Sequence, residues 1–449
     1  MSWPGFPVDS RRPRQIRKPQ GEHLPFKPDQ SQVHDELPFE WLAILVLFAY
    51  CAREPFAGAV QFYLGDASLG FLWFVPDGIA LLCVVALLAT DMLNGSWRFL
   101  FFLVVIAYYM LLGYISIGSA ASSLSGFKAL LPLLSGVLIT RSVLQRRWVQ
   151  IGLVTLLIVA IVGVWWSVGH ELPWARSSFD SGLGTKQFRA TVWAAGGGVR
   201  PFGFSSDQHY AASSILFLFA FIGAYRRSYI FYWLAVPVGA TIFVTTSRTS
   251  LLAFVILLGL RILLDLFERG HRPRATQLVT AVTPFLVPLL PISVMAFGQL
   301  YSASEIPSSL FSLWIRGNEV FLQPVLLMPV FAPYGWLFGF GLGGVGFPVM
   351  QSNYSSYLAI IDNFLLFSYY SFGIPFVFYY LFLCMRNAAD PDMHKRIVFC
   401  VAVLFGQFIL GWANGMFMMA LGYAASSAFL SRRPPKKVSY DQTYKPAIA

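Results

Sequence analysis

Long apolar stretches recur along the chain, and they constrain its fold more than any other feature of the sequence. A helix needs about twenty predominantly apolar residues to cross the hydrocarbon core of a bilayer. Stretches near that length lie at residues 38–56, 71–91, 97–118, 127–141, 148–169, 208–225, 229–247, 249–267, 275–299, 361–385, 396–413 and 415–431. The sequence therefore predicts an all-α, polytopic membrane helix bundle with about twelve transmembrane helices. The number is eleven if the last two stretches form one helix, kinked at Trp412, Asn414 and Gly415.

The composition excludes several soluble classes of protein. Hydrophobic residues make up 57% of the chain and charged residues only 12%, whereas a soluble domain has about 25% charged residues. A folded soluble enzyme of 449 residues could not bury that much apolar surface. The same figures exclude a disordered chain and a disulfide scaffold.

Basic residues between the apolar stretches predict the orientation, because cytoplasmic loops carry an excess of Lys and Arg. With the N-terminal tail in the cytoplasm and the spans alternating, the cytoplasmic side collects Arg11, Arg12, Arg14, Arg17, Lys18, Arg141, Arg146, Arg147, Arg226, Arg227, Arg269, Arg272, Arg274, Lys395, Arg396, Arg432, Arg433, Lys436 and Lys437. The far side keeps only Arg53, Lys128, Arg176, Lys186, Arg189, Arg200, Arg248 and Arg316. We therefore expect both termini in the cytoplasm. The net charge of +11 then reflects membrane topology and contact with the lipid bilayer, with no nucleic acid as partner.

The chain divides into a membrane domain and two tails. Residues 1–37 are expected to form a basic, Pro-rich, disordered cytoplasmic tail, residues 38–431 the transmembrane domain, and residues 432–449 a second cytoplasmic tail. Two long loops, 170–207 and 300–360, interrupt the domain on the far side of the membrane. Loops longer than about fifteen residues are usually functional or disordered. The second loop is too apolar for a disordered linker, so we expect it to contain short helices at the membrane surface.

Three arginines on the far side are candidate ligands for an anion. Arg200 lies in G-G-G-V-R-P-F-G-F, Arg248 in T-T-S-R-T-S, and Arg316 in L-W-I-R-G-N-E. A guanidinium left unpaired in the membrane costs roughly 2–3 kcal/mol, so such residues usually mark a site. Arginine also binds phosphate in a bidentate manner. The sequence therefore predicts a phosphate or pyrophosphate site. The alternatives are that Arg248 reaches to the lipid headgroups and that the other two form structural ion pairs.

A transfer reaction at such a site also needs a general base. The candidates on the far side are Asp362, with Asp207, His209 and Glu319 as alternatives. Asp362 stands at the mouth of the 361–385 stretch, where partial desolvation would raise its pKa towards that of a useful base. The alternative role of Asp362 is a helix N-cap. His and acidic residues are too scattered to predict a metal site, and we expect neither a metal nor another cofactor.

Four segments resemble the O-antigen polymerase and ligase family, which comprises Wzy-type polysaccharide polymerases, lipid A-core O-antigen ligases and related exopolysaccharide polymerases. R-P-F-G-F-S-S-D-Q-H-Y-A-A at 200–212 is similar to the family's segment that runs from an Arg and a Gly into a helix. T-T-S-R-T-S-L-L-A-F at 245–254 is similar to its Ser–Arg–small helix start. G-F-G-L-G-G-V-G at 339–346 and D-N-F-L-L-F-S-Y-Y-S-F-G at 362–373 are similar to its Gly-rich stretch and to the segment that ends its long loop.

The resemblance covers roughly residues 195–385 and implies a membrane glycosyltransferase without a metal. Such enzymes transfer glycan from an undecaprenyl-pyrophosphate carrier at the periplasmic face of the bacterial inner membrane. Arg200, Arg248 and Arg316 would then bind the donor's pyrophosphate, which is also the leaving group. A base would take the proton of the acceptor hydroxyl.

Two departures from the family pattern bear on the base. Ligases have a histidine where Asp362 stands, which favours a polymerase. The family's Pro–Asn step is replaced by Gln208 and His209, so His209 is a rival base.

The leading hypothesis is an O-antigen or exopolysaccharide polymerase that joins undecaprenyl-pyrophosphate-linked repeat units. A chain-length regulator and a flippase are the partner proteins to look for. The first alternative is an O-antigen ligase that transfers glycan to a lipid acceptor. The alternative from another class is a transporter or flippase of lipid-linked oligosaccharide, but the sequence has sparse charge within its spans and no evident repeat.

Overall fold

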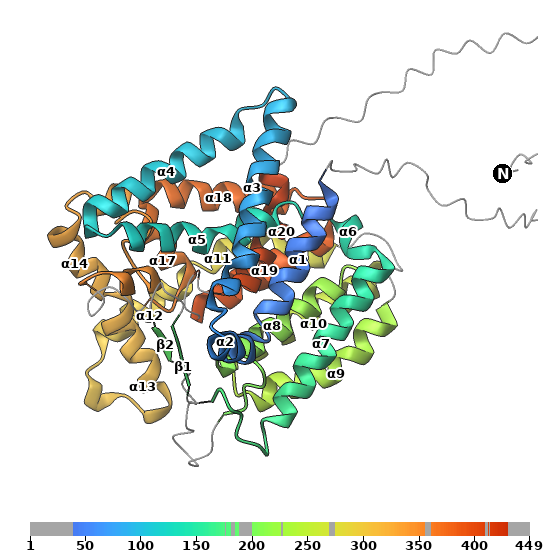
Figure 1. Ribbon diagram of the computed structural model, residues 1–449. Coiled ribbons are helices and arrows are strands. Elements are labelled where there is room, and N and C mark those ends of the chain that lie inside the picture. The colour runs from blue at the N-terminus through green and yellow to red at the C-terminus, as the bar shows by residue number, and fades with distance from the viewer. Residues whose placement is uncertain are drawn as a thin grey trace, which may run out of the picture. The chain divides into compact units, whose positions relative to one another are not determined.

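The computed structural model describes residues 39–175, 177–180, 185–187, 200–225, 228–268, 274–354, 361–408, 412 and 414–429 (Figure 1). These residues form a helical fold with a small antiparallel hairpin, in which Ser178 pairs with Gln187. The predicted all-α class is confirmed. The tails predicted at 1–37 and 432–449 lie outside the described residues.

The elements follow one another closely along the chain. The first part contains α1 (Glu40–Arg53), α2 (Ala57–Asp66), η1 (Gly70–Phe74), α3 (Val75–Leu93), α4 (Arg98–Ile117), α5 (Ala120–Gly136), α6 (Arg141–Gln145), α7 (Arg147–Trp166), β1 (Ser178–Asp180) and β2 (Thr185–Gln187). The second part contains α8 (Gln208–Ile222), α9 (Ser228–Val244), α10 (Arg248–Glu268), α11 (Arg274–Leu286), α12 (Leu289–Leu300), η2 (Ala303–Glu305), α13 (Ser308–Ile315), η3 (Arg316–Phe321), α14 (Gln323–Phe331), α15 (Gly335–Phe338), η4 (Phe347–Gln351), α17 (Phe364–Phe372), α18 (Ile374–Ala388), α19 (Met393–Phe405), η5 (Gly406–Phe408) and α20 (Gly415–Phe429).

Several helices are long and apolar enough to cross a membrane. Among the described residues these are Gly70–Leu93, Arg98–Ile117, Arg147–Trp166 and Arg248–Leu266. Two bent helix pairs, α1 with α2 at 84° and α11 with α12 at 42°, raise the number from four to six if each pair is one span. The helices α8, α9, α18 and α20 are shorter but also apolar. The protein is a multi-pass membrane protein, as the sequence predicts.

Several predicted spans differ from the helices in their ends. The helix predicted at 38–56 ends at Arg53, two residues before Pro55, because proline cannot continue the helical hydrogen bonds. The 361–385 stretch is divided into α17 and α18 at Gly373, whose φ of +65° is left-handed. The helices α19 and α20 are separate and pack against each other, so the alternative of one kinked helix is wrong.

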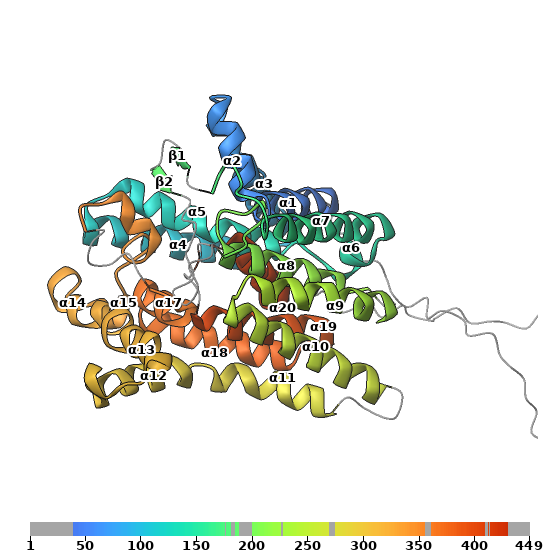
Figure 2. The same ribbon diagram turned by 90° about the horizontal axis from the view of Figure 1, so that it is seen from below.

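Three helices form the centre of the bundle. Nearly every residue of α8, α19 and α20 is buried, and α20 packs against α5, α8, α18 and α19 (Figure 2). The peripheral helices instead expose large apolar side chains, for example Phe101 on α4 at 70% and Trp233 on α9 at 79%. A helix that is apolar all round belongs in a core, whereas an apolar surface of this extent fits contact with lipid.

The glycine-rich stretch 339–346 packs between α4 and α5. The Leu342 amide donates to the Tyr109 carbonyl at 2.8 Å. A Cβ atom added at Gly113 would lie 1.9 Å from the Leu342 carbonyl oxygen, and one at Gly126 would lie 2.6 Å from the Gly343 nitrogen. The glycines therefore allow close backbone packing. The loop predicted at 300–360 contains short helices, as expected.

Candidate functional site

The segment that leads into α8 fixes the first group of candidate residues. The Trp174 indole donates to the Gly203 carbonyl at 3.1 Å, and the Gly203 amide donates to Ser167 Oγ at 3.1 Å. Asp207 then caps α8, because its carboxylate accepts from the amides of His209 at 2.8 Å and Tyr210 at 2.9 Å. This cap places the His209 ring in the first turn of the helix, and it occupies one oxygen of Asp207.

The turn before α10 lies against this histidine. Ser247 is buried, and its Oγ lies 3.5 Å from Nδ1 of His209 and 2.9 Å from Oγ of Ser250. Thr246 has a φ of +59°, which is rare for a β-branched residue. Backbone strain of this kind persists where surrounding structure enforces it, and it clusters at functional sites. The turn thus brings the serine to the histidine at some conformational cost.

Arg316 begins a π-helical turn, η3, which follows α13. Turns of this type are rare and occur frequently at functional sites. Gly317 packs tightly on α12, since a Cβ atom there would lie 2.1 Å from the Val294 carbonyl oxygen. The Tyr370 hydroxyl of α17 donates to the Phe321 carbonyl at the other end of the turn, at 2.6 Å. These contacts hold Arg316 beside the segment that carries Asp362.

Arg316 and Asp362 form a loose ion pair, with 3.7 Å between Nε and Oδ2. The side chains are 32% and 25% exposed, so neither is fully buried in the protein. Asp362 is not a helix cap. That role belongs to Asn363, whose Oδ1 accepts from the Leu366 amide at 2.9 Å. The carboxylate of Asp362 is therefore not used in capping α17.

Asn363 also anchors the segment to the core. Its Nδ2 donates to the carbonyl of Gln407 at 2.9 Å and to the side-chain Oε1 of Gln407 at 3.1 Å. Both side chains are buried. A buried amide with matched partners fixes the backbone next to it, so Asn363 and Gln407 position Asp362. Neither residue was predicted from the sequence, although the D-N-F segment contains a helix-cap signal.

The charges of the site act on one another across chain segments far apart in sequence. His209 has exposed surface at the start of α8, and partial desolvation lowers its pKa. The carboxylates of Asp207 and Asp362 raise this pKa. The guanidinium groups of Arg200 and Arg316 lower it. Desolvation likewise raises the pKa of Asp362, against the lowering effects of Arg316 and His209. A neutral histidine and a carboxylate with a raised pKa are both candidates for a proton acceptor.

The structure thus brings together Arg200, Asp207, His209, Arg316 and Asp362, and we call these five residues the charged cluster. Nε of Arg200 is buried and has no hydrogen-bond partner among the described residues.

Two other candidates stand apart from the charged cluster. Arg248 is exposed at the start of α10 and makes no ion pair within the described part of the chain, although its neighbour Ser247 contacts His209. Glu319 is exposed on η3.

A second group of charged residues lies near Tyr210, and its ion pairs were not predicted from the sequence. Arg53 pairs with Glu54 at 2.8 Å and with Asp77 at 3.0 Å, and Lys128 lies 3.5 Å from Asp77. The charges of Glu54 and Arg53 reach Tyr210 in the first turn of α8. This group is neutral in sum, so each charge has a partner that offsets part of its desolvation cost.

No protein-family model matches the chain, and no curated protein or solved structure matches it. Within the described ranges, no three His, Cys, Asp or Glu side chains gather closely enough to hold a metal ion.

Proposed function

We propose that the protein is a polysaccharide polymerase of the O-antigen polymerase and ligase kind. It would join undecaprenyl-pyrophosphate-linked repeat units at the periplasmic face of the bacterial inner membrane. The observation that carries the proposal is the charged cluster, in which arginines and proton acceptors from three distant segments meet at helix ends.

The cationic side chains suit a diphosphate. Arg200 has a buried Nε without a partner in the described chain. The one ion pair of Arg316 among the described residues is loose, at 3.7 Å. Guanidinium groups bind phosphate oxygens through two parallel hydrogen bonds. In the proposed reaction they stabilise the negative charge that grows on the leaving diphosphate, and Arg248 contributes from the exposed start of α10.

The ion pair between Arg316 and Asp362 suggests how Asp362 becomes free to act as the base. A diphosphate that binds Arg316 replaces Asp362 as its anionic partner. Asp362 then takes the proton of an acceptor sugar hydroxyl, and the hydroxyl oxygen forms a bond to the donor's anomeric carbon with inversion. The bond between that carbon and the diphosphate oxygen breaks, and undecaprenyl pyrophosphate leaves with both electrons. Asp207 is a weaker candidate for the base because it already caps α8.

The membrane arrangement is part of the proposal. The four long helices, both bent pairs and the shorter α8, α9, α18 and α20 are taken to cross the membrane, and so are α5 and α19. This gives about twelve spans, cytoplasmic termini and a periplasmic charged cluster. A lipid-linked oligosaccharide is the substrate, and a chain-length regulator and a flippase are the partner proteins.

A ligase remains the second candidate because of His209. The family's ligases have a histidine where Asp362 stands, and here His209 lies within electrostatic range of Asp362. In that case the acceptor is a lipid rather than a second repeat unit.

The test uses the purified full-length protein in lipid vesicles with a lipid-pyrophosphate oligosaccharide and no metal or nucleotide sugar. Chain growth is expected for the natural protein and should be lost in Arg316→Ala and in Asp362→Asn. Glu319→Gln is the matched control, since Glu319 lies on the same π turn and outside the charged cluster. Transfer to a lipid acceptor without chain growth would identify a ligase. Undiminished growth in both variants would refute the proposal.

A further inference from the structure

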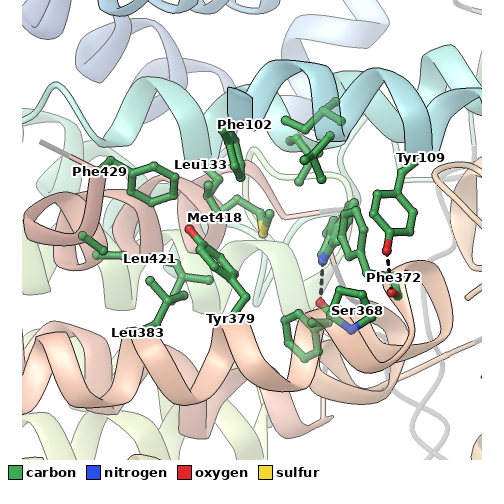
Figure 3. A pocket seen from close by; sticks show the side chains of 18 of the residues that line it. Phe102, Tyr109, Leu133, Ser368, Phe372, Tyr379, Leu383, Met418, Leu421 and Phe429 are labelled. Atoms are coloured by element: carbon green, nitrogen blue, oxygen red, sulfur yellow. Dashed lines mark hydrogen bonds between the residues drawn. The ribbon is translucent and has the colours of Figure 1, made fainter. Parts of the chain in front are cut away.

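An apolar cavity of about 370 Å³ lies among α4, α5, α17, α18 and α20. Figure 3 shows its lining, with Phe102, Leu133, Tyr379 and Phe429 towards one end and Tyr109 and Phe372 towards the other. The volume lies within the range of ligand pockets, roughly 300–1,000 Å³. The cavity is large enough for part of a ligand that enters from outside.

The polar groups of the lining mostly bind each other. The Tyr109 hydroxyl donates to the Phe372 carbonyl at 2.9 Å, and the Trp412 indole donates to Ser368 Oγ at 3.1 Å. A site for a polar ligand presents converging polar groups to it. These groups are already paired, whereas the Tyr379 hydroxyl has no partner among the described residues and Arg98 brings a charge to the lining. The rest of the surface left to a ligand is hydrocarbon and aromatic.

The cavity is elongated and reaches the lipid-facing surface. Its lining along α4 extends from Arg98 to Tyr109, which is roughly 16 Å of helix at 1.5 Å per residue. Phe101 at its rim is 70% exposed, and Phe378 on the neighbouring α18 is also 70% exposed. A long, narrow apolar space that opens between such helices fits a hydrocarbon chain that enters from the bilayer.

The lining of the cavity includes a residue that is close in sequence to the charged cluster. Phe364, in the first turn of α17, lines the cavity, and Asp362 lies two residues before it. We propose that the cavity between α4 and α18 binds the polyisoprenoid chain of the lipid diphosphate whose head lies at the charged cluster. The choice of this chain rests on the proposed function. The cavity thereby sets the class of carrier lipid, since a long hydrocarbon chain must follow the diphosphate.

The test is photo-crosslinking of the full-length protein in vesicles with a polyprenyl diphosphate that carries a diazirine in its chain. Cross-linked peptides should come from α4, α18 and α20. Val105→Trp fills the cavity, whereas Val104→Trp on the same helix places the ring on the surface, where Val104 is 58% exposed. The tryptophan ring introduced at position 105 would displace about two methylene groups of the lipid chain from the cavity. At about 0.8 kcal/mol for each methylene group, this weakens binding of the chain roughly tenfold. Labelling should fall by that factor in Val105→Trp and stay unchanged in Val104→Trp. Ala428→Phe, at the Phe429 end, is a second filling variant.

The outcomes separate this proposal from the proposed function. Equal labelling in the filled and control variants, with all proteins folded by gel filtration, overturns the cavity as the chain site. A phospholipid held at Arg98 is the competing occupant. The cavity is also probed with a phospholipid that carries a diazirine. If this probe labels the cavity and unlabelled polyprenyl diphosphate does not displace it, the proposal that the donor's chain occupies the cavity is overturned. Specific labelling by the polyprenyl probe in a protein that transfers no glycan supports the chain site and refutes the polymerase.

Discussion

The ion pair between Arg316 and Asp362 predicts a change in pH dependence when the arginine is removed. Arg316 lowers the pKa of Asp362 against the raising effect of desolvation. If Asp362 is the base, the reaction rate rises as pH increases through this pKa, because the carboxylate form is the active one. Arg316→Gln removes the lowering effect, so the acid limb of the pH–rate profile should move to higher pH.

The distance sets the size of the shift. At 3.7 Å, two unit charges interact by about 4.5 kcal/mol at an effective dielectric constant of about 20 and by about 1.1 kcal/mol at about 80. The side chains are 32% and 25% exposed, so solvent screening favours the lower value. Even the lower value is enough to move the acid limb measurably to higher pH when the charge of Arg316 is removed.

The assay is kcat/KM for chain growth by the reconstituted protein across the pH range, compared with Glu319→Gln as control. The lower overall rate expected from weaker diphosphate binding does not matter, because the prediction concerns the position of the limb. An acid limb that stays in place or moves to lower pH in Arg316→Gln would refute the reasoning.

A second variant decides between the two bases, since Arg316 acts on His209 in the same direction. Asp362→Asn should abolish the reaction if Asp362 is the base. If His209 is the base, the variant stays active. Its acid limb then moves to lower pH, because Asp362 raises the pKa of His209.

Three further substitutions test the packing around the site. Gly113→Ala places a Cβ atom 1.9 Å from the Leu342 carbonyl oxygen and should destabilise the protein by about 1–3 kcal/mol in a thermal-unfolding assay. The control is Gly78→Ala, whose Cβ atom would have no neighbour within 4 Å and should leave stability unchanged. Asn363→Ala removes a helix cap and two buried hydrogen bonds and should cost about 2–4 kcal/mol of unfolding free energy; a cost near zero would contradict its positioning role. Tyr379→Phe deletes a buried hydroxyl without a partner among the described residues and should raise stability by about 1 kcal/mol, measured against the natural protein.

The sequence predicts the helices well because each apolar run is a local property of the chain. The runs at 97–118 and 148–169 correspond closely to α4 and α7. The breaks within runs were less visible, because they depend on single residues such as Pro55 and Gly373. The hairpin at β1 and β2 was not predicted.

The site was predicted only in part, because which side chains meet depends on packing between distant segments. The pairing of Arg316 with Asp362 follows from a π turn held by Gly317 and Tyr370, and no spacing rule indicates it. Arg248 was one of the three arginines predicted to bind an anion, yet its side chain is exposed outside the charged cluster. Its position at a helix start was predictable, whereas the direction of the side chain was not.

The balance of charge in the cluster explains why it can exist without a ligand. Arg200 and Arg316 are offset by Asp207 and Asp362, with His209 neutral when its pKa is lowered. Three arginines without such partners would repel one another strongly in a partly desolvated place. The structure pairs Arg316 with Asp362, holds Arg200 in the same cluster as Asp207, and leaves Arg248 exposed outside the cluster. In the proposed reaction a diphosphate exchanges places with Asp362 at Arg316, so the carboxylate becomes free when the donor is bound. Proton transfer is then coupled to donor binding by the same guanidinium.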